Sequence, residues 1–305
     1  MTSGDALVDV MLTHYGRLDL VQETVRSVLA QDDPGWRLTV VDDSGELPDA
    51  GLGAWCAGLG DDRVRYLRNA RNLGINRNFQ RCVELVEQEL AVIIGSDDAM
   101  LPGYVGAVRA AHRAHPQVAI VQPGVIVVDG QGVPARTVVD LAKRWVYAPR
   151  VSAPTVLGGE ELAVSLLRGN WLYFPAICWR AGPLRRTGFR EGLSVVQDLA
   201  LVLDLVLDGE SLLVDPTPAF RYRRHRGSVS SAHAADGRRF AEERGFFLDT
   251  AARMQAHGWP RAARAARQHL SSRINAFLQL PSAMAQRDTG GARTLARHAF
   301  GGRAG

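Results

Sequence analysis

The sequence has only three cysteines, Cys56, Cys82 and Cys178, and no two of them form a CxxC pair. An odd number of widely separated cysteines argues against a disulfide scaffold and against a cysteine zinc site, and it favours a reducing, cytoplasmic environment. Cys82 and Cys178 lie in apolar segments, so we expect them to be small core residues rather than nucleophiles.

The sequence also lacks a run of eighteen apolar residues, and its first residues do not have the charged start and apolar stretch of a signal peptide. We therefore expect no integral membrane segment. No run of Arg and Lys alternates with aromatic residues, which disfavours nucleic-acid binding. A GxxxxGK[ST] loop is absent, and no GxGxxG follows the first apolar run, so a P-loop kinase and a dinucleotide-dependent dehydrogenase are both disfavoured.

The composition is that of an ordinary globular protein, with 46% hydrophobic and 22% charged residues in a chain of 305 residues. This length is enough for one large α/β domain with a helical appendage. The net charge of +4 comes from arginines that are widely spread and become denser toward the C-terminus, so it favours anionic ligands only weakly.

Short apolar runs alternate with segments of helical periodicity along most of the chain. The runs predict strands over 7–12, 37–43, 63–68, 91–95, 118–122, 125–130, 211–216 and 219–225, with the stretch 170–180 returning to the sheet. Helices are predicted after Leu18, after the loop at 72–74, and over 103–115, 158–169 and 196–209. This alternation indicates a parallel sheet with helices on both faces, followed by two or three helices between about 236 and 300 with a break at 257–260.

Polar residues follow three of the predicted strands. They are Thr13 to Arg17 after the first strand, Asp42 to Ser44 after the second, and Ser96 to Asp98 after the strand 91–95. The carboxyl ends of neighbouring parallel strands meet at one edge of a sheet, where ligands bind. An aromatic ring, a carboxylate and an arginine suit a nucleobase and its phosphates, and a carboxylate pair such as Asp97 and Asp98 suits a divalent cation that bridges those phosphates.

These motifs, in the order VMLTHYGR, VVDDSG, RNLGINRNF, GSDDAM, QDLALVLDL and YRRHRGSVS, resemble the family 2 glycosyltransferases of GT-A fold over about residues 7 to 231. The resemblance implies an α/β fold of GT-A type, a Rossmann-like mixed sheet flanked by helices, with a C-terminal helical extension. It divides the chain into a glycosyltransferase domain over 1–232 and a helical region over 233–305. The nucleotide-binding half of the domain covers about 1–122 and the acceptor half about 123–232.

The resemblance also assigns roles to individual residues of the chain. Thr13, Tyr15 and Arg17 would line the nucleotide pocket, Asp43 would accept a hydrogen bond from the base, and Asn72, Gly74 and Arg77 would form a loop over the nucleotide. Ser96, Asp97 and Asp98 stand where the family has its DXD motif, with Asp98 as the ligand of Mn²⁺ or Mg²⁺ and His225 near the metal or the diphosphate. Asp198 occupies the place of the catalytic base.

The implied function is metal-dependent transfer of a sugar from a UDP-, dTDP- or GDP-sugar to a hydroxyl or amine of a small metabolite or glycan precursor, with inversion at the anomeric carbon. A non-catalytic protein that binds nucleotide-sugars is the alternative, and a phosphotransferase with an Asp nucleophile is a third hypothesis. For the arginine-rich C-terminal helices we favour a solvated face or a homodimer surface, and peripheral contact with an anionic membrane stays open.

Overall fold

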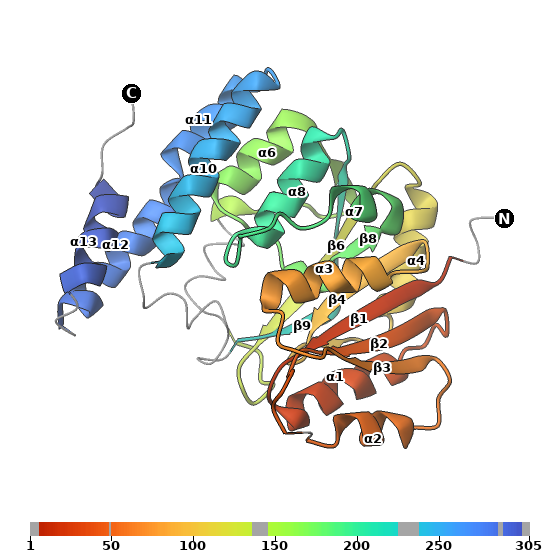
Figure 1. Cartoon of the computed structure of the whole chain (residues 1–305). Coiled ribbons are helices and arrows are strands. Elements are labelled where there is room, and N and C mark those ends of the chain that lie inside the picture. Colours follow the sequence, from red (N-terminus) through yellow and green to blue (C-terminus); the bar gives the residue numbers. More distant parts are fainter. Residues whose placement is uncertain (1–5, 49, 136–145, 225–237, 286–288, 301–305) are drawn as a thin grey trace.

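The computed structural model describes residues 6–48, 50–135, 146–224, 238–285 and 289–300. Within these ranges, nine strands form one sheet in the order β3-β2-β1-β4-β8-β6-β9-β5, with β7 paired to β9 (Figure 1). The strands are β1 (Val8–His14), β2 (Trp36–Asp42), β3 (Val64–Arg68), β4 (Leu90–Gly95), β5 (Ala99–Met100), β6 (Ile120–Val128), β7 (Thr155–Leu157), β8 (Cys178–Arg180) and β9 (Leu212–Arg223). The pairs of β1 with β2, β1 with β4 and β2 with β3 are parallel, whereas β8 is antiparallel to both its neighbours. The predicted mixed sheet is confirmed.

Helices cover both faces of the sheet (Figure 1). They are α1 (Leu18–Leu29), α2 (Leu52–Ala57), α3 (Ile75–Leu85), α4 (Tyr104–Ala114), α6 (Gly159–Arg168), α7 (Ala181–Thr187) and α8 (Gln197–Leu207), with a short 3-10 turn η2 (Phe174–Ala176). The C-terminal helices are α10 (Arg238–Ala256), α11 (Pro260–Gln268), α12 (Leu270–Ala285) and α13 (Thr289–Phe300).

Alternation along the buried strands divides the core into two layers. Val92 and Ile94 of β4 pack with α1, α2 and α4, whereas Ala91 and Ile93 pack on the opposite face with α3, α6, α7 and α8. Successive side chains of a strand point to opposite faces, so an unbroken apolar run such as that of β4 requires cover on both sides. Helices α10 and α11 join the second layer through Phe246 and Ala262, so the first part of the C-terminal region shares the main core.

In two places, two consecutive predicted strands form one longer strand. The runs 118–122 and 125–130 form β6, and the runs 211–216 and 219–225 form β9, which passes through two prolines. The two strands pair in parallel, and the register shifts at Gly124. A Cβ at Gly124 would lie 2.5 Å from the carbonyl oxygen of Pro216. The break in the apolar pattern is therefore an irregularity in the pairing rather than a turn.

The prediction of two or three C-terminal helices was too low, because the described residues of this region form four. The predicted break at 257–260 is confirmed, since α11 begins at Pro260. The further break falls at His269, whose φ of 30° ends α11 in the left-handed region. A histidine gives a weaker sequence signal for such a helix end than glycine does.

Candidate active site

The three polar strand ends meet at one edge of the sheet, as predicted. The end of β1 lies between β2 and β4: His14 pairs with Asp42, and Thr13 pairs with Gly95. The backbone N–H of Asp43 donates to the carbonyl oxygen of His14 over 2.9 Å. Polar residues from three separate segments are therefore neighbours at this edge.

Asp43 is buried and fastens the loop that precedes α3. Its Oδ1 accepts from Asn69 Nδ2 and from the backbone N–H of Leu73, both at 2.8 Å, and its Oδ2 accepts from the N–H of Gly74 at 3.1 Å. Asn72 Nδ2 donates to the carbonyl oxygen of Asp43 over 3.0 Å. Asp43 therefore positions the predicted nucleotide loop, and its contact with a base stays a prediction.

Tyr15 and Arg17 are exposed at the start of α1. The Tyr15 side chain is 61% exposed, and Arg17 pairs with Asp19 over 2.5 Å. Thr13 is turned inward, and its Oγ1 donates to the carbonyl oxygen of Ile94 over 3.3 Å. Tyr15 and Arg17 are thus accessible to a ligand at this edge, whereas the Thr13 hydroxyl holds β1 to β4.

Asp98 is buried, unlike its half-buried neighbours Ser96 and Asp97. Burial, and then the charge of Asp97, raise the pKa of the Asp98 carboxyl well above its ordinary value. The backbone N–H of Arg223 donates to Asp98 Oδ1 over 2.9 Å and opposes this shift. Thr24 Oγ1 also fixes the segment by donating to the carbonyl oxygen of Asp98 over 2.7 Å.

Both carboxylates have an oxygen near Gly95. A Cβ built on Gly95 would lie 3.0 Å from Asp97 Oδ1 and 3.3 Å from Asp98 Oδ2. The two oxygens are therefore on the same side of Gly95, where this residue has no side chain. No cluster of three or more His, Cys, Asp or Glu that could hold a metal occurs within the described ranges. Two carboxylates are sufficient for Mg²⁺, which takes its other ligands from water and substrate phosphates. The predicted ligand His225 lies outside the described residues.

Arg223 is a residue of this site that the sequence motifs did not identify. Its buried guanidinium donates from Nε to the carbonyl oxygen of Asp97 at 2.9 Å, from Nη1 to that of Gly130 at 3.1 Å, and from Nη2 to Glu23 at 2.5 Å. The motif YRRHRGSVS contains Arg223, but the sequence alone does not show that β9 reaches the turn after β4.

Asp198 is half-buried in the first turn of α8, as predicted. Asn170 Nδ2 donates to its Oδ2 over 3.2 Å, and the N–H of Leu199 donates to its Oδ1 over 2.8 Å. The segment before α8 is held from α10, because the N–H groups of Ser194 and Val195 donate to Glu242 Oε1 over 2.8 and 2.7 Å. A C-terminal helix therefore helps to position the candidate base.

Short segments connect Asp198 to the carboxylate pair. The Tyr173 ring lies 5.2 Å from the ring of Tyr222, which directly precedes Arg223. Tyr173 comes three residues after Asn170, the donor to Asp198. Of the other aromatic residues of 170–180, Trp171, Phe174 and Trp179 are buried in the core, so most of this stretch contributes to packing.

An open pocket of about 510 Å³ lies between the start of α3 and the segment before α8. Its lining includes the predicted residues Gly74 and Arg77 on one side and Glu191 and Ser194 on the other. Asn76 Nδ2 joins the two sides by donating to the carbonyl oxygen of Arg190 over 3.0 Å. The pocket thus connects the predicted nucleotide loop to the segment that leads into Asp198.

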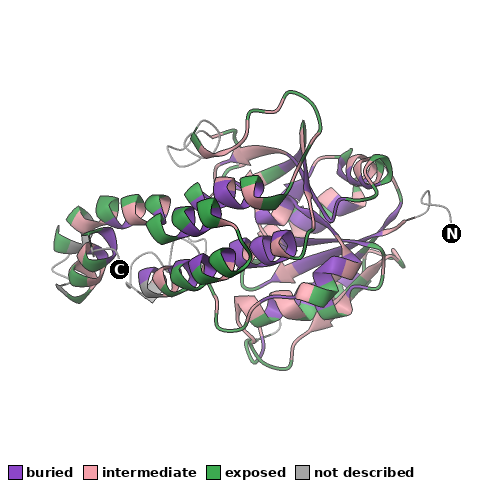
Figure 2. Cartoon of the chain, turned by 90° about the horizontal axis from the view of Figure 1, so that it is seen from above, coloured by how far each residue is buried: buried purple, intermediate pink, exposed green. Residues whose placement is uncertain are grey.

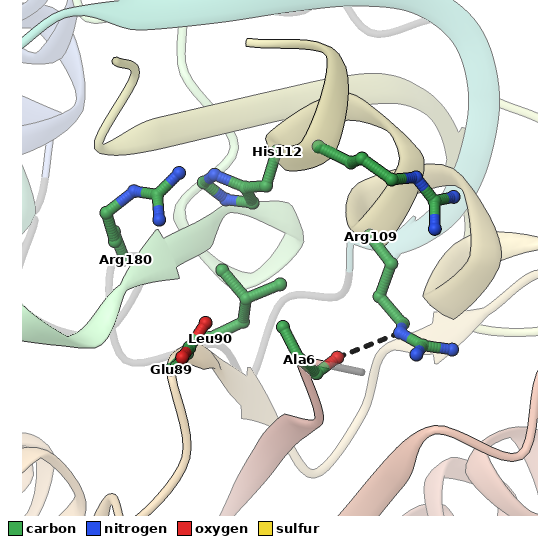
Figure 3. Close-up of a pocket in the computed structure, with 7 residues that line it drawn as sticks. Ala6, Glu89, Leu90, Arg109, His112 and Arg180 are labelled. Carbon is green, nitrogen blue, oxygen red and sulfur yellow. Dashed lines mark hydrogen bonds between the residues drawn. The ribbon is translucent and has the colours of Figure 1, made fainter. Parts of the chain in front are cut away.

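A second pocket lies at the opposite edge of the sheet, where β1 and β4 begin (Figure 3). Figure 3 shows His112 and Arg180 close together there, and Arg109 Nε donates to the carbonyl oxygen of Ala6 over 2.8 Å. Burial and the charge of Arg180 lower the pKa of His112 to about 4. The cavity of about 10 Å³ has room for no more than a water molecule, so it is not a substrate site.

Comparison with known proteins finds a family match in the N-terminal half of the chain. Residues 9–152 match the family model described as Glycosyl transferase family 2. A stretch of 97 residues is 33% identical to the uncharacterized protein MT1568 of Mycobacterium tuberculosis, covering 32% of this chain and 30% of that protein. A stretch of 107 residues is 27% identical to an Escherichia coli K12 protein named as the colanic acid biosynthesis glycosyl transferase WcaA, covering 35% and 38%. The chain thus matches about a third of the length of these curated relatives.

Solved structures match over nearly the whole chain. S. aureus TarS 1-349 in complex with UDP-GlcNAc has a TM-score of 0.61 at 15% identity, covering 95% of this chain and 90% of that one. The same protein in complex with UDP has a TM-score of 0.56 at 15% identity, covering 97% and 92%. At this identity the likeness shows the fold. The predicted resemblance to family 2 glycosyltransferases and the GT-A type of fold are both confirmed.

Proposed function

We propose that this chain, with a family 2 glycosyltransferase match over residues 9–152, transfers a sugar from a nucleotide-sugar donor to a hydroxyl or amine acceptor and inverts the anomeric centre. The observation that supports this most strongly is the meeting of three strand ends at one edge, where Asp43 holds the loop that lines an open pocket together with the segment before α8. The TarS structures contain UDP-GlcNAc or UDP, which supports a uridine nucleotide as the first donor to test.

The diphosphate of the donor would lie over the carboxylate pair. A Mg²⁺ or Mn²⁺ held by Asp98, with Asp97 beside it, would supply a Lewis acid for the negative charge that the departing diphosphate acquires. The exposed Arg77 at the start of α3 and Arg17 at the start of α1 are cations that can pair with phosphate oxygens. Tyr15, before the start of α1, supplies an exposed ring for the base.

The acceptor would be activated by Asp198. Its carboxylate takes the proton of the acceptor hydroxyl while the oxygen attacks the anomeric carbon and the bond to the diphosphate oxygen breaks. Asn170 holds one carboxylate oxygen, and the N–H of Leu199 holds the other, so the side chain has a defined orientation. Attack from the face opposite the diphosphate inverts the configuration.

The donor nucleotide, the cation and the acceptor class are part of the proposal. The cytoplasm is the proposed compartment, because all three cysteines are buried and free. No helix within the described ranges is both long enough and apolar enough to span a membrane.

The test is a comparison of Asp198→Asn with the wild type in Mn²⁺-supported donor hydrolysis and sugar transfer, using UDP-, dTDP- and GDP-sugars. A general base contributes roughly 10²–10⁴ in rate, so we expect a loss of that order with donor binding retained. The matched control is Asp208→Asn, an exposed carboxylate at the other end of α8. Donor binding without turnover by the wild type would instead identify a nucleotide-sugar binding protein, and equal rates for Asp198→Asn would reject Asp198 as the base.

A further inference from the structure

Helix α12 carries its large apolar side chains on the outside. Leu270, Ile274, Phe277, Leu278 and Met284 are between 44% and 68% exposed. Together with Pro281, these residues recur at helical intervals, so they lie along one stripe of the helix over four turns. Phe300 of α13 extends the stripe, since its ring lies 5.7 Å from that of Phe277 and is itself 64% exposed.

The inward side of the same helix carries one large apolar residue, Leu280, and is otherwise small and polar. Ala276 packs there with Phe240, Leu295 and Ala299, and Ser272 bonds to Glu243 and to His298. A helix that served only to complete a monomer would place its Leu and Phe residues inward. This reversed distribution indicates that the outer stripe, which we call the α12 stripe, binds an apolar partner outside the monomer.

The C-terminal segment that carries the α12 stripe is strongly basic. Residues 250–300 contain eight arginines and a single acidic residue, Asp288. Arg267, Arg293 and Arg297 are exposed, and none of them forms an ion pair within the part of the chain that the structure describes. A two-fold contact between two copies through this face would bring arginine-rich surfaces together, which is unfavourable.

We infer that α12 and α13 form an interfacial docking surface for anionic phospholipid bilayers, with the α12 stripe inserted at the headgroup level and the arginines on lipid phosphates. Apolar residues on one face together with arginines at its border are the features that bind helices to such membranes. Figures 1 and 2 place α12 and α13 on the side of the molecule opposite the amino terminus, which is the side toward which β1 runs. Docking would therefore direct the strand ends of the candidate site toward the membrane side. This inference does not depend on the proposed reaction.

The experiment is co-sedimentation of the full chain with vesicles of phosphatidylcholine and phosphatidylglycerol, compared with vesicles of phosphatidylcholine alone. We expect binding to the anionic vesicles that weakens as salt is raised. Loss of one buried large apolar side chain corresponds to about tenfold or more in partitioning, so Phe277→Glu with Leu278→Glu should lower binding at least that much. Arg293→Glu with Arg297→Glu should lower binding to the anionic vesicles only.

The matched control is Val133→Glu with Val156→Glu, which introduces the same two negative charges at exposed valines outside α12. It should bind vesicles as the wild type does, and circular dichroism of all variants should show unchanged helix content. Equal binding of the wild type and the Phe277, Leu278 variant would overturn the inference. So would a stable dimer in light scattering that the same variant converts to monomer without any vesicle binding, since a second copy would then occupy the stripe.

Discussion

The backbone N–H of Arg223 donates to Asp98 Oδ1 over 2.9 Å, although the two residues lie 125 positions apart in the chain. The Arg223 guanidinium also donates to the carbonyl oxygen of Asp97. The last residue of β9 therefore holds both members of the carboxylate pair. Two neighbouring carboxylates at the end of a buried strand are tolerated because their segment is fastened from a second strand and a positive charge lies beside it.

Removal of the Arg223 guanidinium should destabilise the fold. We expect Arg223→Met to lower the free energy of unfolding by about 2–4 kcal/mol, because two carbonyl oxygens in its surroundings lose a charged donor. Urea unfolding followed by circular dichroism measures this. Glu23→Gln is the matched control, since Glu23 is 51% exposed and the amide oxygen of Gln can still accept from Arg223 Nη2, so it should cost less than Arg223→Met. Equal losses for the two variants would mean that the guanidinium does not anchor this turn.

A close backbone approach supports the nucleotide loop. Gly45 has a φ of +57°, and a Cβ there would lie 2.3 Å from the backbone nitrogen of Asn72. We expect Gly45→Ala to cost about 3 kcal/mol, from the left-handed conformation and the clash together, and to weaken donor binding. Gly60→Ala has a similar φ of +64° with nothing within 4 Å, so it should cost only about 1 kcal/mol. Thermal melts and nucleotide titrations of the pair separate the two effects, and an equal cost would refute the close approach.

Buried histidines should make the protein sensitive to acid. The pKa values of His112 and His298 are lowered to about 4, mainly by burial, from an ordinary value of 6.5. As pH falls below 6.5 the unfolded chain takes up protons that the folded chain refuses until about pH 4. The contribution of these histidines to the free energy of unfolding is therefore fully present above pH 6.5 and is lost as the pH falls from 6.5 to 4.

The measurement is the free energy of unfolding of the wild type and of His112→Gln across this range of pH. The variant should lose less stability on acidification, because one of the groups with a lowered pKa no longer titrates. The control is His257→Gln, at an exposed position. If His112→Gln and the wild type show the same slope, His112 is not neutral in the folded protein.

The sequence predicted those parts of the fold that depend on local pattern. Apolar runs of four to seven residues with helical segments between them identified β1, β2 and β4, and the parallel pairing of these strands brought Thr13, Asp43 and Asp97 to one edge. The hydrophobic periodicity and the turn residues are sufficient to predict these strands, because each element buries its own side chains against the next. The strand β9 was predicted as two strands, since its prolines resemble a turn until the pairing with β6 is known.

The contacts that hold the site together could not be predicted in the same way. Arg223 and Glu242 act on residues 125 and 47 positions away, respectively, and no local spacing encodes such pairs. Asp43 was predicted to accept a hydrogen bond from a base, which stays a prediction, and the sequence did not show that its carboxylate also binds the loop before α3. A carboxylate after a strand looks the same in the sequence whether its partner is a ligand or a backbone N–H.

The central claim is that Asp98 helps to hold a divalent cation on the diphosphate of a nucleotide. The most direct test is calorimetric titration of the wild type and of Asp98→Asn with UDP, dTDP and GDP, each with and without Mn²⁺. Asparagine keeps an oxygen for the N–H of Arg223 and removes the charge. We predict that Mn²⁺ strengthens binding of one nucleotide to the wild type by about tenfold or more and has little effect on Asp98→Asn. Nucleotide binding that is independent of Mn²⁺, or a cation effect of the same size in both proteins, would contradict the account.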